Sequence, residues 1–290
     1  MHKKKPPGRG KKHSADAPEK GQIPRTKNDY SLFYAHIERK VYTMSETKIQ
    51  SLASMLNTCR RAVFFGGAGV STESGIPDFR STGGLYNQEW RYPPETILSH
   101  TFFLNSTEEF YRFYRKKMLF PQAKPNAAHE ALAELERMGI LTAVITQNID
   151  GLHQAAGSQH VIELHGTVHK NFCTRCRKPY SLEEILKGEG VPRCCCGGVI
   201  KPAVVLYEES LPSDAIEDAL DAIASSDLLI IGGTSLAVYP AAGFVQNYRG
   251  RLVIINRSPT HMDRQADLLI DQPIGETFRE TMKVLRGMRG

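Results

Sequence analysis

The chain lacks the features that place a protein in a membrane or outside the cell. Its N-terminal region is basic and proline-rich with no apolar segment behind it, so a secretory signal peptide is not expected. One uncharged stretch, residues 228–245, is broken by Gly232-Gly233 and Pro240, which argues against a membrane-spanning helix. Hydrophobic content of 41% and charged content of 23% are ordinary for a globular protein. We therefore expect a cytoplasmic protein that does not contact membranes.

Most of the chain also lacks net charge, although the whole carries +6. Residues 1–29 hold nine Lys and Arg against three Asp and Glu, and the other 261 residues hold 28 of each sign. A domain that binds nucleic acid normally has its own basic face. Nucleic-acid binding is therefore not expected of the folded part, whereas the tail has the charge to attract polyanions weakly.

The N-terminal segment is short of large apolar residues. Residues 1–28 cannot bury enough surface to offset chain entropy, so they are predicted to be disordered. Residues 30–43 are more apolar and are compatible with a short helix or a docked segment. Met44 precedes a helical pattern, so translation starting there is an alternative that mass spectrometry of the native N-terminus would decide. We take residues 1–44 as an extension and residues 45–290 as the folded body.

Apolar runs alternate with helical patterns through the folded body. The predicted strands cover residues 62–65, 141–145, 161–164, 228–231 and 252–255, and the predicted helices cover residues 126–138, 214–224, 239–247 and 275–285. This alternation predicts an α/β fold, a Rossmann-like parallel sheet with helices on both faces. Ligands of such sheets bind at the carboxyl ends of the strands, where most of the polar clusters of this chain stand.

Two segments interrupt the alternation. Residues 79–125 are aromatic-rich and helical in pattern, and residues 167–202 contain five of the six cysteines. We interpret both as insertions that together form a small domain. The large domain then consists of residues 45–78, 126–166 and 203–290.

A glycine-rich turn, Gly66-Gly67-Ala68-Gly69, follows the first predicted strand. Glycines there let backbone N–H groups approach a pyrophosphate. Thr72 stands where the dinucleotide fingerprint needs its third glycine, so a plain strand–helix turn is an alternative on this motif alone. Gly232-Gly233-Thr234-Ser235 and Asn256, at two other strand ends, strengthen the nucleotide interpretation.

The clustered cysteines have the spacing of a metal site. Cys173 and Cys176 form a C-x-x-C pair, followed by the run Cys194-Cys195-Cys196. Two close pairs at this separation predict a closed, structural four-thiolate zinc site, since disulfides are not expected in a reducing compartment. We choose Cys194 and Cys196 as the second pair because Gly197-Gly198 can turn around a metal, although Cys195 is an alternative ligand.

Polar groups at two more strand ends suit catalysis and recognition. His165 ends an apolar strand before the cysteine insertion and can act as a general base, or else simply pack and cap the strand. Residues 147–150, Gln-Asn-Ile-Asp, offer amides and one carboxylate, which suit a carboxamide and sugar hydroxyls. Alone, they could equally cap the helix that follows.

Taken together, these motifs resemble those of the sirtuins, the NAD-dependent protein lysine deacylases, and particularly the bacterial-type members. The resemblance covers about residues 45–290 and rests on motifs in a fixed order: residues 67–80 (GAGVSTESGIPDFR), 146–153 (TQNIDGLH), 164–166 (LHG), the paired cysteines, 233–235 (GTS) and 255–257 (INR). It implies a catalytic domain with a Rossmann-like part, a zinc ribbon and a helical module, and NAD in the cleft between them.

The resemblance also implies roles for individual residues. His165 would be the general base, with Asp150 on the nicotinamide carboxamide and Thr234 and Ser235 at the phosphates. Asn256 would contact the adenosine ribose, and the backbone near Ile274 the adenine. The other implied cofactor residues are Ala68, Thr72, Phe79 and Arg80 in the first loop and Gln147, Asn148 and Ile149 around nicotinamide and its ribose.

The implied reaction transfers an acetyl group from lysine to ADP-ribose, as a protein acetyllysine N-acetyltransferase. The products are free lysine, nicotinamide and O-acetyl-ADP-ribose. A neutral His165 is required, so activity should fall below a pKa of about 6.5 if that value is unperturbed. Alternatives are ADP-ribosyl transfer to protein, a deacylase that prefers longer acyl groups, and an NAD-sensing scaffold without turnover.

The implied peptide site lies between residues 204–209, which include Val205 and Tyr207, and residues 235–238, where an extended peptide could add as a strand. Many sirtuins have Phe-Gly-Glu where this chain has Tyr207-Glu208-Glu209, which puts peptide preference in question. The chain lacks the Tyr-x-x-Arg pair that binds succinyl groups in desuccinylating relatives. Short neutral acyl groups are therefore favoured, with acetyl first.

Overall fold

The computed structural model describes residues 45–290. The chain divides into two compact units, Met1–Glu46 and Thr47–Gly290, and the second contains the strands, the cavity and the cysteine cluster. The sequence predictions about tail disorder, about residues 30–43 and about a start at Met44 lie outside the described residues.

A six-stranded sheet forms the centre of this unit. Its order is β3-β2-β1-β7-β8-β9, and every pairing between neighbouring strands is parallel. The strands are β1 (Ala62–Gly66), β2 (Leu141–Thr146), β3 (Val161–Glu163), β7 (Leu228–Gly232), β8 (Arg251–Ile255) and β9 (Leu268–Ile270). All residues of β1 and β7 are buried, as expected for strands covered on both faces. The predicted Rossmann-like architecture is confirmed.

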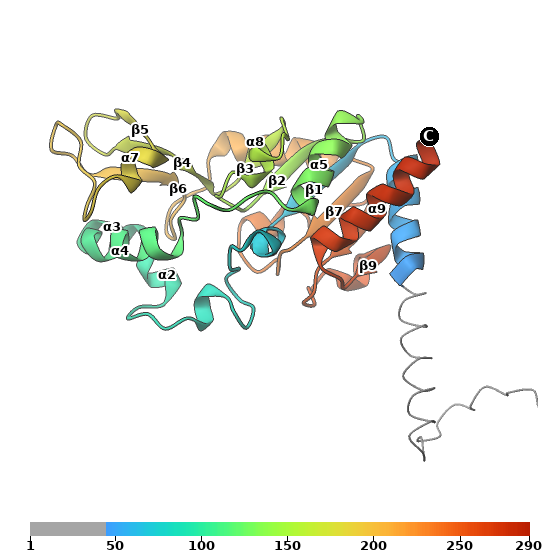
Figure 1. Ribbon diagram of the computed structural model, residues 1–290, viewed down its shortest axis with the longest axis horizontal. Coiled ribbons are helices and arrows are strands. Elements are labelled where there is room, and N and C mark those ends of the chain that lie inside the picture. Colours follow the sequence, from blue (N-terminus) through green and yellow to red (C-terminus); the bar gives the residue numbers. More distant parts are fainter. Residues whose placement is uncertain (1–44) are drawn as a thin grey trace, which may run out of the picture. The chain divides into compact units, whose positions relative to one another are not determined.

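Helices cover both faces of the sheet (Figure 1). On one face lie residues 47–58, drawn as the blue helix, with α5 (Ala127–Arg137) and α9 (Ile274–Arg289), which share one apolar core with the sheet. On the other face, α8 (Ser213–Ser225) and the 3₁₀ turn η3 (Ala241–Gly243) pack on a second core. Because apolar side chains of the strands point alternately to the two faces, each core draws on every second strand residue.

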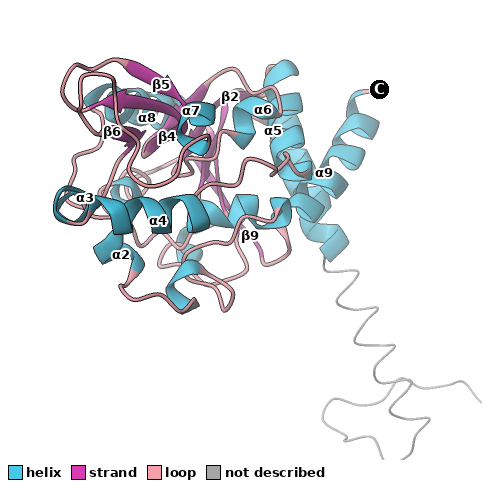
Figure 2. Ribbon diagram, turned by 60° about the vertical axis from the view of Figure 1, so that its left-hand side comes forward, coloured by secondary structure: helices cyan, strands magenta, loops and turns pink. Residues whose placement is uncertain are grey.

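The two insertions share a third apolar core. Residues 167–202 supply most of an antiparallel sheet of β5 (Pro179–Ser181), β4 (Gly166–Cys173) and β6 (Ile200–Val204), and the short helix α7 (Leu182–Leu186). The aromatic insertion forms α2 (Pro94–Ile97), α3 (His100–Asn105) and α4 (Thr107–Lys117). Figure 2 shows α3 and α4 beside this sheet, which agrees with the predicted small domain; its boundaries stay a prediction.

Local signals set the ends of α5. The side chain of Asn126 accepts a hydrogen bond from the N–H of Ala128 at 2.9 Å, and His129 Nδ1 accepts from the N–H of Asn126 at 3.2 Å. Beyond the helix, Gly139 adopts φ +69°, a conformation that favours glycine. Asparagine before a helix and glycine after it are typical end signals, so these two positions account for the bounds of α5.

Two elements differ from the sequence prediction. Residues 239–247 form the 3₁₀ turn η3 between other turns instead of a helix, because Pro240 lacks an N–H and Gly243 is a weak helix former. The three-residue strand β9 was missed, since so short a run carries no periodicity to detect. In addition, the glycine turn leads into a 3₁₀ helix, η1 (Ala68–Ser74).

Among residues 45–290, no helix combines the length and the apolar character that crossing a bilayer requires.

Two histidines are fully enclosed beneath the cavity-forming loops. His129 on α5 and His153 on α6 (Leu152–Ala155) are 0% and 1% exposed, with ring centroids 4.7 Å apart. Neither ring nitrogen of His153 has a hydrogen-bond partner, and Nε2 of His129 has none either. Burial lowers the pKa of His129 to about 4, against a small opposing effect of Asp150, and lowers that of His153 to about 3. Both rings are therefore neutral at pH 7.

This pair predicts a loss of stability in acid. An unfolded histidine protonates near pH 6.5, whereas these two stay neutral in the folded state, so acid favours unfolding below pH 6.5. The slope is at most about 1.4 kcal/mol per pH unit for each histidine. Urea unfolding between pH 7 and pH 5 measures it. His153→Phe should flatten the slope, and the exposed His160→Ala should not; equal slopes in all three proteins would contradict the assignment.

Candidate active site

One large cavity opens where the parallel strands end. It has a volume of about 1140 Å³, slightly above the usual range for small-molecule sites. Its lining comes from the ends of β1, β2, β7 and β8, from the loop before β4, and from the insertion of residues 79–125. The position agrees with the rule that ligands of parallel sheets bind at the carboxyl edge.

Two glycine turns meet backbone to backbone at the floor of this cavity. The N–H of Gly69 donates to the carbonyl of Gly233 at 2.8 Å, and a Cβ on Gly69 would lie 2.8 Å from Gly233 Cα. Gly233 has φ +58°, and a Cβ there would lie 2.4 Å from the N of Val70. Side chains are excluded at both positions because the two turns pack against each other there, and both glycines line the cavity.

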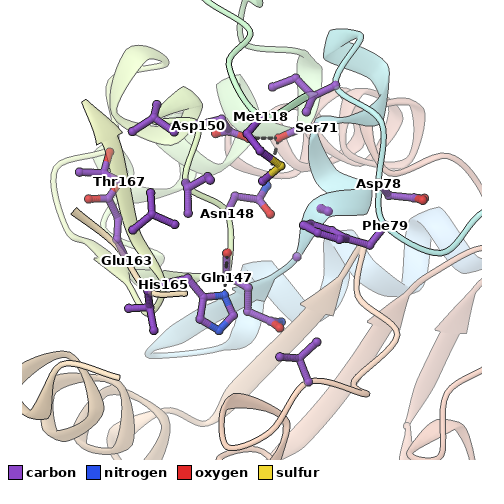
Figure 3. Close-up of a pocket in the computed structure, with 18 of the residues that line it drawn as sticks. Ser71, Asp78, Phe79, Met118, Gln147, Asn148, Asp150, Glu163, His165 and Thr167 are labelled. Carbon is purple, nitrogen blue, oxygen red and sulfur yellow. Dashed lines mark hydrogen bonds between the residues drawn. The ribbon is translucent and has the colours of Figure 1, made fainter. Parts of the chain in front are cut away.

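Asp150 is held by a buried polar network (Figure 3). The Ser71 hydroxyl donates to Asp150 Oδ2 at 2.6 Å, and the N–H of Leu152 donates to Oδ1 at 2.9 Å. The side-chain amide of Asn148 donates to Ser71 Oγ at 3.0 Å. Asp150 therefore lines the cavity and also accepts a hydrogen bond from the first residue of α6, while its role in recognising a ligand stays a prediction.

Polar side chains from different strand ends contact one another across the cavity. Gln147 Nε2 donates to Thr234 Oγ1 at 3.1 Å, and Thr234 Oγ1 accepts from the N–H of Leu236 at 3.2 Å. Arg80 lies 3.4 Å from Ser235 Oγ, and its guanidinium lies over the ring of Tyr86 at 5.5 Å. The predicted cofactor residues of three separate segments therefore meet in one place.

His165 projects into the cavity in a defined tautomer (Figure 3). Its Nδ1 lies 2.9 Å from the carbonyl oxygen of Gln147, which can only accept, so Nδ1 carries the proton and Nε2 is left as the base. Burial lowers the pKa of this imidazole, while the bond to Gln147 acts in the opposite direction. The ring is therefore neutral at pH 7, as a general base must be.

The predicted peptide strip borders the same cavity. Tyr207 pairs with residues 98–100, because its N–H donates to the Leu98 carbonyl and its carbonyl accepts from His100, both at 3.0 Å. Its hydroxyl lies 3.0 Å from that of Tyr86. Glu208, at the family's glycine position, adopts φ +75°, and its carboxylate accepts from the N–H of Thr101 at 2.9 Å.

Most of the predicted cofactor and substrate residues line the cavity. They are Ala68, Phe79, Arg80, Gln147, Asn148, Ile149, Asp150, His165, Val205, Tyr207, Thr234, Ser235 and Asn256. Thr72 and Ile274 do not: Thr72 bonds the Gly69 carbonyl at 2.9 Å, and Ile274 is a core residue at the start of α9. Sequence reasoning missed Ser71, although it lies inside the quoted glycine motif, and Met118 and Glu163, for which no local signal exists.

The cysteines of the insertion gather in one cluster. The Sγ atoms of Cys173, Cys176, Cys194 and Cys196 all lie within 4.8 Å of one another, the set chosen from the sequence. Cys195 lies outside this set and is exposed. The Sγ pairs 173–196 and 176–194 are each separated by 3.5 Å.

This cluster fits a tetrahedral metal ion. Zinc–sulfur bonds of about 2.3 Å place tetrahedral thiolates about 3.8 Å apart, close to the separations found. The N–H groups of Arg175 and Cys176 lie 3.4 and 3.5 Å from Cys173 Sγ, which suits a thiolate. A Cβ on Gly198 would lie 2.6 Å from the same sulfur, so glycine is required there. The four cysteines are thus positioned for a structural zinc.

Fold and site together define an NAD-type α/β enzyme with a thiolate metal module. Residues 67–240, more than half of the chain, match the Sir2 family, and the chain belongs to that family. An NAD-dependent protein deacetylase of Clostridium acetobutylicum is 54% identical over 236 residues, covering 80% of this chain and 96% of that protein. One of Clostridium perfringens is 54% identical over 238 residues, covering 80% and 98%.

Solved structures agree with the sequence comparisons. A Sir2 structure with deacetylated p53 peptide and acetyl ADP ribose has a TM-score of 0.76 and 42% identity, and covers 81% of this chain and 97% of that one. A Sir2 structure with p53 peptide and NAD⁺ has a TM-score of 0.73 and 42% identity, covering 83% and 98%. The predicted resemblance to the sirtuins is confirmed.

The cysteine cluster gives a test with a matched control. Cys173→Ser should lose zinc and fold poorly, because a structural metal contributes directly to folding free energy. Cys195→Ser removes a neighbouring thiol outside the cluster and should keep one zinc per chain. Elemental analysis and thermal unfolding of both variants provide the measurement. A stable, active, zinc-free Cys173→Ser protein would rule out a structural site.

Proposed function

We infer that this chain is an NAD-dependent protein lysine deacetylase that acts on acetylated proteins or peptides. The observation that carries the inference is the meeting of a neutral, half-buried histidine base with a held carboxylate and amide network in one cavity of a Sir2-family fold. The two clostridial relatives carry the same activity in their names. Acetyl is transferred to ADP-ribose, and nicotinamide is released.

The residues present fit NAD. The two glycine turns line the cavity without side chains at Gly69 and Gly233, which leaves room for a pyrophosphate with Thr234 and Ser235 beside it. Asn148 and Asp150 present an amide and a carboxylate, which complement a carboxamide. When bound, NAD supplies the ribose carbon that accepts the acyl oxygen as nicotinamide leaves. The roles of Ala68, Thr72, Phe79, Arg80, Asn256 and Ile274 stay predictions.

His165 supplies the base. With its proton on Nδ1 held by the Gln147 carbonyl, Nε2 can take a proton from a ribose hydroxyl. The fixed tautomer means that no proton has to move within the ring before the step. The low pKa of the buried ring keeps it ready near neutral pH.

The substrate side favours a short neutral acyl group. Tyr86 and Tyr207 bring two hydroxyls together beside the cavity, and burial raises the pKa of Tyr86, so its hydroxyl stays neutral. Arg91, the arginine nearest in sequence to Tyr86 on its C-terminal side, lies over the ring of Tyr92 and does not line the cavity. Acetyl is therefore proposed ahead of succinyl. Val205 and Tyr207 stay proposed peptide contacts.

Removal of the base tests the function. His165→Ala should abolish deacetylation of an acetyl-peptide, a loss of at least about a hundredfold for a general base, and leave NAD binding largely intact. Mass spectrometry of the peptide and calorimetry with NAD provide the two measurements. The control His160→Ala changes an exposed histidine that bonds the Thr142 carbonyl away from the cavity, and should behave as wild type.

The same assay separates the alternative reaction. Nicotinamide release that requires the acetyl group supports deacetylation. Label transferred from NAD to protein, irrespective of acetylation, would instead support ADP-ribosyl transfer, and the absence of any turnover would support an NAD-sensing scaffold. Wild-type turnover by His165→Ala would refute the assigned base.

The pH profile provides a further prediction. Because burial lowers the pKa of His165 below the ordinary value of about 6.5, the base stays neutral until the pH falls below that value. The acid limb of kcat/KM should therefore have its midpoint below about 6.5, more acidic than the sequence alone indicated. Steady-state rates from about pH 5 to 8, in buffers of constant ionic strength, measure it. A midpoint above about 6.5 would contradict the burial of a neutral ring.

Location and other partners stay proposals. A cytoplasmic location is supported by the cysteine cluster, because a reducing compartment keeps the thiols available for a metal. That the folded part does not bind nucleic acid, and that the tail attracts polyanions, rest on the charge distribution alone.

A further inference from the structure

His165 and the beginning of β4 hold the loop of residues 147–151 through three of the loop's carbonyl groups. His165 Nδ1 donates to Gln147 at 2.9 Å, and the N–H of Val168 donates to Ile149 at 3.0 Å. His169 Nε2 lies 3.0 Å from the carbonyl oxygen of Asp150, so that nitrogen carries a proton and donates. The third bond comes from a side chain that has no role in the proposed mechanism.

The imidazole of His169 also lies directly against Gly151, the residue after Asp150. A Cβ on Gly151 would lie 2.5 Å from His169 Nε2 and 2.7 Å from Cδ2. Gly151 adopts φ +73°, which glycine takes at no steric cost. Ring and turn are therefore fitted to each other, and the ring limits how the peptide after Asp150 can rotate.

Asp150 is consequently fixed at both its backbone and its side chain. Ser71 and the N–H of Leu152 hold the two carboxylate oxygens, and His169 holds the carbonyl oxygen. The donor to Oδ1 belongs to the next peptide, so the turn at Gly151, which the His169 ring covers, also sets the position of the Leu152 N–H beside the carboxylate. Such fixation raises the affinity of the Asp150 carboxylate for a carboxamide in one orientation, because preorganised groups lose less entropy on binding.

We propose that His169 is a positioning residue, which holds the Asp150 peptide so that the carboxylate stays in place for the nicotinamide carboxamide. The proposal rests on the role of Asp150 in the proposed function. His169 acts through Asp150, because its ring donates to the backbone carbonyl of that residue and not to its carboxylate. Both the neutral ring with Nε2–H and the protonated ring can make this bond.

The experiment compares His169→Ala, His169→Gln and His160→Ala in the full-length protein. His169→Ala should raise the KM for NAD and the inhibition constant of nicotinamide about fivefold, the effect of one hydrogen bond. The KM for acetyl-peptide should stay unchanged. His169→Gln, whose amide can donate from a similar position, should restore both values to within about twofold. His160→Ala, which loses another histidine–carbonyl bond, should have no effect.

An Asp150→Asn variant separates the two ways of failing. If it keeps wild-type values for NAD and nicotinamide, the proposed role of Asp150 is wrong, and the proposal for His169 is overturned with it. If Asp150→Asn is impaired while His169→Ala matches wild type, only the role of His169 is overturned. The same holds if His169→Ala and His169→Gln are equally impaired, or if both KM values and the melting temperature change together.

Discussion

The close backbone approach of two strand-end turns is the constraint on which the site depends. Gly66 and Gly232 are register partners on β1 and β7, so the turns after these strands begin at the same level of the sheet. Gly69 and Gly233 then meet with no room for a Cβ on either. Parallel pairing thus places two backbone segments without side chains next to each other, and beside them Gln147 contacts Thr234 and Arg80 contacts Ser235.

The second organising feature is the continuity of β4. This strand begins directly after His165 and ends at Cys173, the first residue of the thiolate cluster. The strand β6, which pairs with β4, leads from Ile200 toward the peptide strip at Val205 and Tyr207. The metal module is therefore connected through two paired strands to the base and to the substrate side. Loss of the metal is therefore expected to disturb the geometry of the active site, although no ligand cysteine lines the cavity.

The sequence predicted the site best where polar, chemically reactive residues directly follow a strand. Strong apolar runs located five of the six parallel strands, and the polar residues after them met in the cavity because parallel strands end at one edge. It was uninformative where packing decides: β9 exists through pairing with β8, and His169 is recognisable only once β4 lies over the loop of residues 147–151. Contacts between distant segments leave no periodic or spacing signal.

Residues 205–207 of the proposed peptide strip limit the way in which a substrate could bind there. The N–H groups of Val205, Leu206 and Tyr207 donate to the His165 carbonyl, the Glu209 carboxylate and the Leu98 carbonyl. An extended peptide beside these residues would therefore meet no free amide among them. Its own amides would have to donate to carbonyl groups, of which those of Leu206 and Tyr207 already accept one bond each. On the other side, the amide donors can come from residues 235–238 apart from Leu236, whose N–H already donates to Thr234 Oγ1. A substrate held between the two segments would thus align its backbone by both, which leaves its side chains to decide preference.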